Sequence, residues 1–536
     1  MSIITLFPKI HITLVSILVL WLSILVIYLI SISQNHGVFV YALDDAYIHL
    51  AVSKNLAINN IWGVTEYHFS SSSSSILWTI SLAILIYVFG NHEIIPLLFN
   101  IFLSTVLIFM LSFYVQKYTD NIKRVSLLIF ILAVIFVAPI PALIFSGMEH
   151  ILHILLFLVF FFTSISFLNN SSKKLSKQYF ILLVIAPLLT AARYESLFVI
   201  FIMCLLLLYK RFFVKSIFIG IIALLPLLIF GLISVENSWF FFPNSVLLKG
   251  NQPNISGMDS IISFFRRPLA SLWHNPHLFF TIICFIIIGR RIIHHSRQLL
   301  YMLLVYIASF TLHIIFADTG WFYRYDAYLT VMGFVLIFIS LENKNFILFA
   351  KKRAQSYYLS FLIFVILGFT LVYRGVISTI ETPQAMNDRY YEHFFPAKFV
   401  SNYYDNSTVV VNDLGAIAYF TKAKILDMYG LGSIEPILFR KKDNGYSSND
   451  LEKWARKEKA TIAILQIQWS EVNQRIPENW VKVSEWIIPR NVVFHDTKVG
   501  FFATDYISAQ RLKDNLHFFD SELPKEINQN FTNDNE

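Results

Sequence analysis

Cysteine is nearly absent from this 536-residue chain, which has only Cys204 and Cys284, both inside apolar runs. Two such cysteines form neither a disulfide framework nor a zinc-binding pattern, so we expect both to be small core residues. The string Gly430-Leu431-Gly432 is too short for the glycine-rich dinucleotide-binding fingerprint, which excludes that class. The chain also has no repeat of the solenoid type.

A signal-peptide cleavage site is missing as well. No small-residue cleavage motif follows the first apolar run, residues 12–32, and this run is too long for the core of a signal peptide. We therefore expect the run to be kept as a first membrane span.

Apolar side chains are abundant: 56% of the residues are hydrophobic, and the mean hydropathy is +0.62. Runs of about 20 apolar residues, each able to cross a hydrocarbon core of about 30 Å, predict a polytopic membrane protein. The 42 Lys and Arg residues outnumber the 34 Asp and Glu residues. Because the basic residues lie in short loops between apolar runs, we interpret them as topology signals and expect no nucleic-acid partner.

Eleven apolar runs are candidate transmembrane helices. They lie at about 12–33, 94–115, 125–142, 150–168, 178–192, 194–209, 215–234, 276–290, 298–317, 326–342 and 357–374. Alternate loops carry the basic residues Lys117, Lys123, Arg124, Lys173, Lys174, Lys177, Lys210, Arg211, Lys215, Arg290, Arg291, Arg297, Lys344, Lys351, Lys352 and Arg353. The positive-inside rule places these loops and the N-terminus in the cytoplasm and the C-terminal region outside.

Carboxylates collect in the opposite loops. They are Asp44, Asp45, Glu66, Glu93, Glu149, Glu195, Asp318 and Asp326. This separation requires that Ile76–Phe89 does not cross the membrane. We expect that short run, which follows the Ser-rich stretch 70–75, to be a helix at the outer interface, with Trp78 and Tyr87 at headgroup depth.

The composition changes after about Gly375, beyond which charged and polar residues are frequent. We therefore expect a transmembrane domain over 1–374 and a soluble extracytoplasmic domain over 375–536. Residues 408–412 and 461–465 read as buried strands. The stretch 450–459 reads as an amphipathic helix between them, with Asp450 at its N-cap, so the domain is predicted to be α/β. We expect the polar stretch beyond about Glu522 to be frayed.

Two adjacent carboxylates, Asp44 and Asp45, stand just past the first span, and His49 follows four residues after the second. In a helix, Asp45 and His49 share a face while Asp44 points about 100° away. One carboxylate can then bind a metal or orient a group while the other takes a proton, although Asp also favours helix starts. Asp45 and His49 are the candidate ligands for a divalent cation, Mg²⁺ or Mn²⁺, which one Asp pair does not establish by itself.

Further ionisable and polar residues lie at the outer ends of spans, where a charge is costly unless it has a partner. Glu149 follows a turn glycine, Arg193 and Glu195 interrupt a long apolar stretch, and Asn244 precedes Lys249 in an interfacial segment. Arg324 stands among aromatic residues. A helix-capping Glu149, internal Arg193–Glu195 and Arg324–Asp326 pairs, and a snorkelling Lys249 are the structural alternatives. The functional interpretation is recognition of a lipid phosphate.

These motifs resemble those of bacterial C-type (GT-C) polytopic glycosyltransferases that use polyprenyl-phosphate sugars, including the arabinofuranosyltransferase-like and mannosyltransferase-like enzymes. The resemblance rests on the following stretches: Asp44–Ile48, the Ser run into Leu77-Trp78-Thr79, Ser146–Glu149, Arg193–Glu195, Pro243–Ser245 with Lys249, Arg324-Tyr325, Asn412–Tyr419 and Asp427–Leu431. Relatives often have Arg-Pro-Glu where this chain has Arg193-Tyr194-Glu195.

The resemblance implies about eleven transmembrane helices with a C-terminal extracytoplasmic α/β domain, in a bacterial inner membrane. It implies that Asp44 or Asp45 is the base, with Asp44 favoured, and that Arg193, Lys249 and Arg324 surround the lipid phosphate. Glu149, Glu195 and Asn244 complete the candidate substrate-binding set. The implied reaction moves a sugar from a polyprenyl-phosphate donor to an envelope glycan, lipid or protein acceptor, with inversion.

Two other classes of protein remain as alternatives. A transporter or flippase would place its charges near the midplane, within broken helices of repeated halves. Here the ionisable residues lie at span ends and no repeat is visible. A non-catalytic scaffold that displays the C-terminal domain would not need clustered acids and cations. A glycosyltransferase is therefore the favoured hypothesis.

Overall fold

Each of the eleven apolar runs becomes helical in the computed structural model, which describes residues 9–119, 122–169, 176–249, 258–292, 296–342, 354–442, 444–493 and 496–532. The helices that are long and apolar enough to cross a membrane are α2 (Ile10–Gln34), α5 (Ile95–Tyr118), α8 (His150–Asn169), α11 (Phe213–Glu236), α15 (Arg297–Phe316) and Val365–Tyr403. The shorter apolar helices are α4 (Ile76–Phe89), α6 (Arg124–Val137), α9 (Lys177–Ala192), Tyr194–Tyr209, which contains α10 (Leu197–Tyr209), and α16 (Ala327–Leu341).

Helices α13 (Met258–His274) and α14 (Pro276–Ile292) meet at a bend of 98°, so six or seven candidate spans lie in the described part of the chain. The chain is a multi-pass membrane protein, and the expected number of eleven spans stays a prediction. Of the basic residues used to orient it, Lys173, Lys174, Lys344, Lys351, Lys352 and Arg353 lie outside the described residues.

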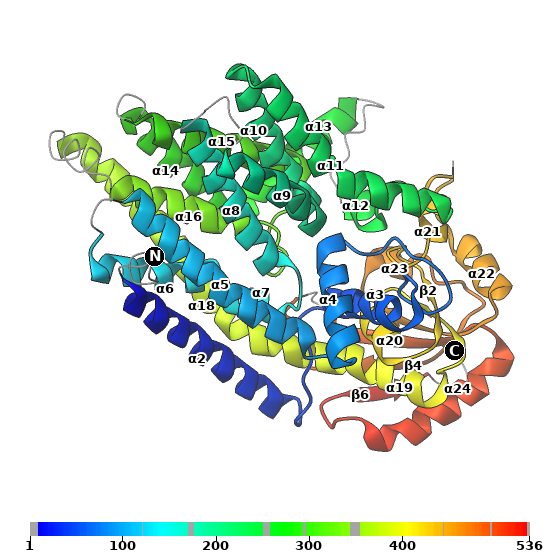
Figure 1. Ribbon diagram of the computed structural model, residues 1–536. Helices are drawn as coiled ribbons and strands as arrows, with labels where there is room; N and C mark the ends of the chain where they lie inside the picture. Colours follow the sequence, from blue (N-terminus) through cyan, green and yellow to red (C-terminus); the bar gives the residue numbers. More distant parts are fainter. Residues whose placement is uncertain are drawn as a thin grey trace.

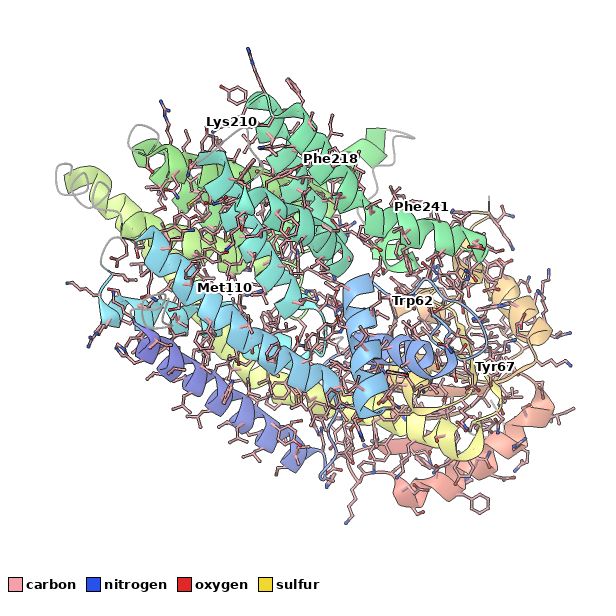
Figure 2. All side chains as sticks on the ribbon, viewed as in Figure 1. Trp62, Tyr67, Met110, Lys210, Phe218 and Phe241 are labelled. Carbon is pink, nitrogen blue, oxygen red and sulfur yellow. The ribbon has the colours of Figure 1, made fainter. Side chains whose placement is uncertain are left out.

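The outer surfaces of α2 and α11 are apolar, as expected for helices that face lipid. Leu18, Trp21 and Leu232 are each at least half exposed. Phe218, also more than half exposed, points away from the bundle on α11 (Figure 2). These side chains have no covering layer of protein in this structure, which suits contact with acyl chains.

Helix α4 forms where the outer interfacial helix was expected. Its N-cap is Ser75, whose hydroxyl accepts a hydrogen bond from the Trp78 N–H. Tyr87 is 81% exposed, but Trp78 is fully buried and stacks on Phe99, with ring centroids 5.2 Å apart. The expectation that Trp78 sits among headgroups is therefore wrong, because the ring faces the protein core.

Helix α18 (Ala354–Arg389) leaves the helical bundle and leads straight into the C-terminal domain (Figure 1). A π-helical turn, η2 (Tyr390–Phe394), joins it to α19 (Phe395–Tyr403) without a loop. π-Helical turns inside α-helices are rare and occur frequently at functional sites. This turn brings His393 to Asp44, at the start of α3 (Asp45–Asn59), while Glu392 pairs with Arg389.

The C-terminal domain is built on a six-stranded mixed sheet of order β2-β1-β3-β5-β4-β6. The strands are β1 (Thr408–Val411), β2 (Lys424–Asp427), β3 (Ala460–Gln466), β4 (Val481–Ile487), β5 (Lys498–Ala503) and β6 (Asn528–Phe531). β1 is parallel to β2 and to β3, while β5 is antiparallel to both β3 and β4, and β6 to β4. The domain is therefore α/β, as predicted from β1 and β3.

Short helices complete this domain and contact the membrane part. They are α20 (Gly415–Phe420), α21 (Glu435–Arg440), α22 (Ser448–Lys457), α23 (Ser470–Asn473) and α24 (Tyr506–Phe519). Of these, α20 packs against α3. The N-cap of α22 is Ser447 and not Asp450, which is the third helical residue and completes a capping box. The expected fraying beyond Glu522 is also wrong up to residue 532, because β6 pairs with β4.

Candidate active site

Asp44 and Asp45 face different parts of the molecule. Asp45 opens α3 and lines a cavity of about 200 Å³. Asp44, one residue earlier, is 5% exposed and contacts the C-terminal domain: its Oδ2 accepts the Gly415 N–H (2.5 Å) and its Oδ1 accepts the Ala416 N–H (2.8 Å). Asp44 therefore does not cap its own helix but holds α20.

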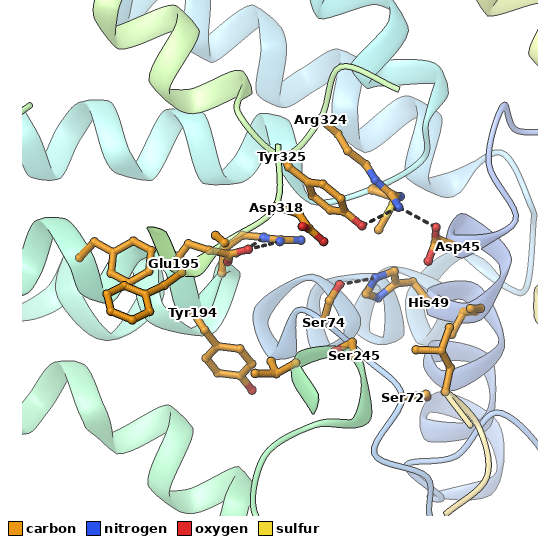
Figure 3. A pocket seen from close by; sticks show the side chains of 18 residues that line it. Asp45, His49, Ser72, Ser74, Tyr194, Glu195, Ser245, Asp318, Arg324 and Tyr325 are labelled. Carbon is orange, nitrogen blue, oxygen red and sulfur yellow. Dashed lines mark hydrogen bonds and ion pairs between the residues drawn. The ribbon is translucent and has the colours of Figure 1, made fainter. Parts of the chain in front are cut away.

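The cavity lies between the start of α3, the Ser-rich stretch and the loops that carry Arg193 and Arg324 (Figure 3), and it is called the phosphate cavity below after the ligand that will be proposed for it. Polar and charged side chains line it: Asp45, His49, Ser72, Ser74, Arg193, Glu195, Ser245, Asp318, Arg324 and Tyr325. Its apolar wall includes Phe198, Phe316 and Leu431, the last from the C-terminal domain. The site therefore combines charged groups with an apolar side, as an amphipathic ligand requires.

Arg324 is 1% exposed and donates a hydrogen bond from Nη2 to Asp45 Oδ2 at 2.8 Å. The same Nη2 lies 3.1 Å from the Tyr325 hydroxyl. The expected Arg324–Asp326 pair does not form, because Asp326 pairs with Arg374 (3.2 Å) and His277 (3.0 Å) instead. Because Asp326 has other partners, the Arg324 side chain points into the phosphate cavity, where its hydrogen bond holds the carboxylate of Asp45.

A second charged group surrounds Arg193. Its Nη1 donates to Glu149 Oε1 at 2.8 Å, and its other nitrogens pair with Glu195. The Arg193–Glu195 pair, which was the structural alternative to phosphate recognition, forms, and the structure adds Glu149, 44 residues away. The Tyr325 ring lies 5.6 Å from the Arg193 guanidinium and 4.8 Å from that of Arg324, so one aromatic ring positions both cations.

His49 lies on the same face of α3 as Asp45, as the spacing predicts, and both line the cavity. Its Nε2 lies 3.3 Å from the Ser74 hydroxyl and 3.6 Å from Glu149 Oε2. Burial lowers the pKa of His49, although Glu149 acts in the opposite direction, so the ring is neutral at pH 7. Glu149 Oε2 is buried and accepts no hydrogen bond from the described residues.

Asn244 and Lys249 belong to the short helix α12 (Asn244–Lys249). The Asn244 amide donates to the Gly430 and Ser433 carbonyls (2.7 and 3.3 Å), and its backbone N–H donates to Ser71 (2.9 Å). Asn244 thus fastens the loop that carries Leu431 beside the cavity. The side chain of Lys249 lies outside the described part of the structure.

A third group of ionisable residues, called the junction cluster below, consists of Asp44, His393 and Asp413. One ligand atom from each lies within 4.8 Å of the others. His393 Nδ1 is 3.6 Å from Asp44 Oδ1, and His393 Nε2 is 3.6 Å from Asp413 Oδ2. This donor set could bind a metal ion, and none of its members lines the phosphate cavity.

Sequence reasoning missed the serine hydroxyls and the junction cluster. Ser72, Ser74 and Ser245 line the cavity, and the buried Ser245 Oγ has no partner among the described residues. In the sequence, these three serines are indicated by their position inside the motifs noted above. His393 carries no local signal, because only the fold brings the end of α18 to Asp44.

The profile of a family described as "Domain of unknown function (DUF8728)" matches residues 385–506. That stretch includes His393, Asp413 and most of the mixed sheet. No curated protein sequence matches the chain.

Solved structures give a wider likeness. ArnT from Cupriavidus metallidurans, bound to undecaprenyl phosphate, superposes with a TM-score of 0.51 at 10% identity, over 92% of this chain and 98% of ArnT. The apo oligosaccharyltransferase of Archaeoglobus fulgidus gives a TM-score of 0.49 at 11% identity, over 94% of this chain and 78% of that one. The same organism's AglB, in complex with an inhibitory peptide and a dolichol-phosphate, gives 0.48 at 12% identity, over 97% and 79%. On the likeness to ArnT, this chain has a GT-C-like fold: a multi-span helical membrane part with a C-terminal mixed α/β domain.

Proposed function

We propose that this protein transfers a sugar from a polyprenyl-phosphate donor to an acceptor at the outer face of a bacterial inner membrane. The observation that carries the proposal is the phosphate cavity, in which a carboxylate, two guanidiniums and serine hydroxyls lie beside an apolar wall. The GT-C-like fold supports it, since ArnT with this fold was solved with undecaprenyl phosphate bound.

Asp45 is the proposed base, in place of Asp44, which the resemblance favoured. Asp45 lines the cavity, whereas both carboxylate oxygens of Asp44 accept backbone hydrogen bonds from α20. The acceptor hydroxyl gives its proton to Asp45 as its oxygen forms the new bond to the anomeric carbon. The bond from that carbon to the phosphate oxygen breaks, and polyprenyl phosphate leaves with the electron pair, which inverts the anomeric centre.

Arg193 and Arg324 are the proposed partners of the donor phosphate, with Ser74 and Ser245 as additional hydrogen-bond donors. The cavity needs further positive charge, because Asp45, Glu149 and Glu195 together outnumber the two guanidiniums. A divalent cation would supply it by offsetting the phosphate charge.

Asp45, His49 and Glu149 are the proposed ligands of that cation. The fit rests on the neutral His49 ring and on Glu149 Oε2, a buried oxygen 3.6 Å from His49 Nε2 with no donor among the described residues. The junction cluster is a second candidate set at a separate place. Metal analysis of purified His49→Gln and His393→Gln proteins distinguishes the two, since only the variant at the occupied site loses bound metal.

The test of the function is sugar transfer by membranes that carry either Asp variant. We expect Asp45→Asn to abolish transfer and Asp44→Asn to retain it in part. Wild-type activity in Asp45→Asn would remove the proposed base. Uptake of substrate into vesicles without any covalent product would favour a transporter instead.

A further inference from the structure

A second cavity, of about 500 Å³, lies on the other side of the loop that carries Arg324. Its wall comes from the bend between α13 and α14, from Gly320–Tyr323, from one face of α18 and from Val492 and Val493 of the C-terminal domain. None of these residues lines the phosphate cavity. The two cavities share the loop 317–326 as a partition, since Asp318, Arg324 and Tyr325 face the first and Gly320–Tyr323 the second.

The partition has an unusual backbone. Gly320, Trp321, Phe322 and Tyr323 all have positive φ angles, of 76°, 42°, 51° and 64°. Three consecutive non-glycine residues in the left-handed region are disfavoured and persist only where their surroundings hold them. Asp326 accepts the Gly320 N–H at 2.8 Å, and Arg374 donates to the Tyr323 carbonyl at 3.2 Å. The turn therefore places three aromatic side chains on the wall of the second cavity.

The α18 wall changes from apolar to charged along the helix. Phe369 and Tyr373 line the end that lies within the apolar run, and both are more than half exposed. Arg374, the next residue along the helix, lines the middle of this face, and Glu381 lines the end close to the C-terminal domain. Twelve residues of helix separate Phe369 from Glu381, a rise of about 18 Å. The cavity wall is therefore apolar at one end and charged at the other, as expected at the boundary between a hydrocarbon region and water.

We propose that the second cavity receives a lipid-anchored acceptor, with its polar head against the hydrogen-bonded side chains of Tyr323 and Glu381 and its apolar tail beside Phe369 and Tyr373. This inference rests on the proposed glycosyl transfer and names its acceptor class. Aromatic rings beside charged groups suit a sugar-bearing or otherwise polar head, and the exposed apolar face of α18 suits an acyl chain. A water-soluble glycan or a peptide would have no use for the lipid-facing end of this cavity.

The loop that lines the second cavity also carries the residue that holds the proposed base. Tyr323 and Arg324 are consecutive residues that face opposite cavities, and Arg324 holds Asp45. An acceptor head at Tyr323 thus lies one residue from the group that fixes the proposed base. Donor and acceptor would approach the reacting centre from the two sides of one loop.

The experiment uses the full chain in vesicles made from the total lipid extract of a deletion strain, which retains unused donor and acceptor. Ile377→Trp fills the second cavity, whereas Val376→Trp places the same ring on the neighbouring, 53% exposed face of α18 that does not line it. Mass spectrometry follows lipids that gain one sugar. We expect Ile377→Trp to raise the half-saturating extract concentration at least tenfold and Val376→Trp to change it less than twofold.

A second measurement does not depend on the folding of the Trp variants. A photo-crosslinking residue is placed at Thr370, which lines the second cavity, and at Val376 as the control. We expect the residue at Thr370 to capture a glycolipid that the residue at Val376 does not capture. Equal activity of the two Trp variants, or identical adducts at both positions, would overturn the acceptor site. So would transfer that occurs only after the strain's aqueous envelope fraction is added. Failure of the proposed function gives a different result, in which the wild-type protein makes no more product than Asp45→Asn.

Discussion

The phosphate cavity and the junction cluster are built from neighbouring residues but satisfy their charges differently. Asp45 accepts a hydrogen bond from the side chain of Arg324, which in turn contacts the Tyr325 hydroxyl, and an incoming substrate can rearrange both side chains. Asp44 is held by two backbone N–H groups of α20, which stay in place as long as the two parts of the protein are joined. One step of about 100° along a helix start thus separates a group suited to chemistry from one suited to assembly.

The strongest test of the difference between Asp45 and Asp44 is to replace each carboxylate with an amide. We expect Asp45→Asn to lower transfer by 10²–10⁴-fold, the usual contribution of a general base, and also to lower the unfolding temperature, because the buried Arg324 loses its paired carboxylate. We expect Asp44→Asn to lower the free energy of unfolding by about 1–3 kcal/mol, because a buried N–H loses its acceptor, and to lower transfer less than tenfold. The two measurements are sugar transfer in membranes and thermal unfolding of the purified protein. The opposite pattern would assign the base to Asp44.

The next largest effect concerns the buried charges around Arg193. Arg193→Ala leaves Glu149 buried without its cation, so we expect a loss of about 3–5 kcal/mol in unfolding free energy together with loss of transfer. Lys398→Ala is the matched control, because its ion pair with Glu522 is well exposed and is worth about 1 kcal/mol or less. Similar unfolding midpoints for the two variants would show that Glu149 does not depend on Arg193.

Some of this site follows from sequence and some does not. The i,i+4 spacing of Asp45 and His49 predicts their shared face, and the short Arg193–Glu195 spacing predicts their pair. The contact of Arg324 with Asp45 spans 279 residues, and nothing in either local pattern indicates it. Asp326 is the nearer partner in sequence, but the bend at α14 and the passing of α18 supply His277 and Arg374 to it.

The fold, like the site, can be predicted from the sequence only in part. Apolar runs predict helices because burial and span length are local properties, and β1 and β3 are found because both are continuous apolar strands. β2, β4 and β6 were missed because their polar residues become acceptable only beside neighbours far along the chain, and β5 was missed although its sequence is mostly apolar and buried. The π-helical turn that brings His393 to Asp44 has no pattern of its own.

A steric change at the junction should have a smaller effect. A Cβ on Gly415 would lie 2.3 Å from the Asp44 carbonyl oxygen and 2.6 Å from its Oδ2. We therefore expect Gly415→Ala to cost about 1–3 kcal/mol and to speed proteolysis between the two parts of the protein. Gly368→Ala is the control, because a Cβ there meets nothing within 4 Å. Equal proteolysis rates would contradict the close approach of α20 to Asp44.

The smallest expected effect is a dependence of the unfolding free energy on pH that comes from one buried carboxyl group. Burial raises the pKa of Glu93, in the loop between α4 and α5, from 4.5 to about 7. A carboxyl whose pKa is higher in the folded state stabilises the protein at low pH, and this contribution is lost as pH rises from about 4.5 through about 7. The shift in pKa corresponds to at most about 3 kcal/mol of unfolding free energy, and the contribution is smaller than this because Glu93 is partly exposed. Unfolding midpoints of wild type and Glu93→Gln between pH 5 and 8 should differ in slope, and parallel curves would contradict the shift.

The helix formed by α18, η2 and α19 runs without a break from the membrane part into the C-terminal domain, and it therefore sets the distance between these two parts. Its 50 residues from Ala354 to Tyr403 extend about 75 Å without a loop that could act as a hinge. The groups proposed for catalysis would therefore work at one fixed height above the bilayer. A substrate anchored in a more distant layer of the envelope would have to be made, or delivered, at the membrane surface before this protein could extend it.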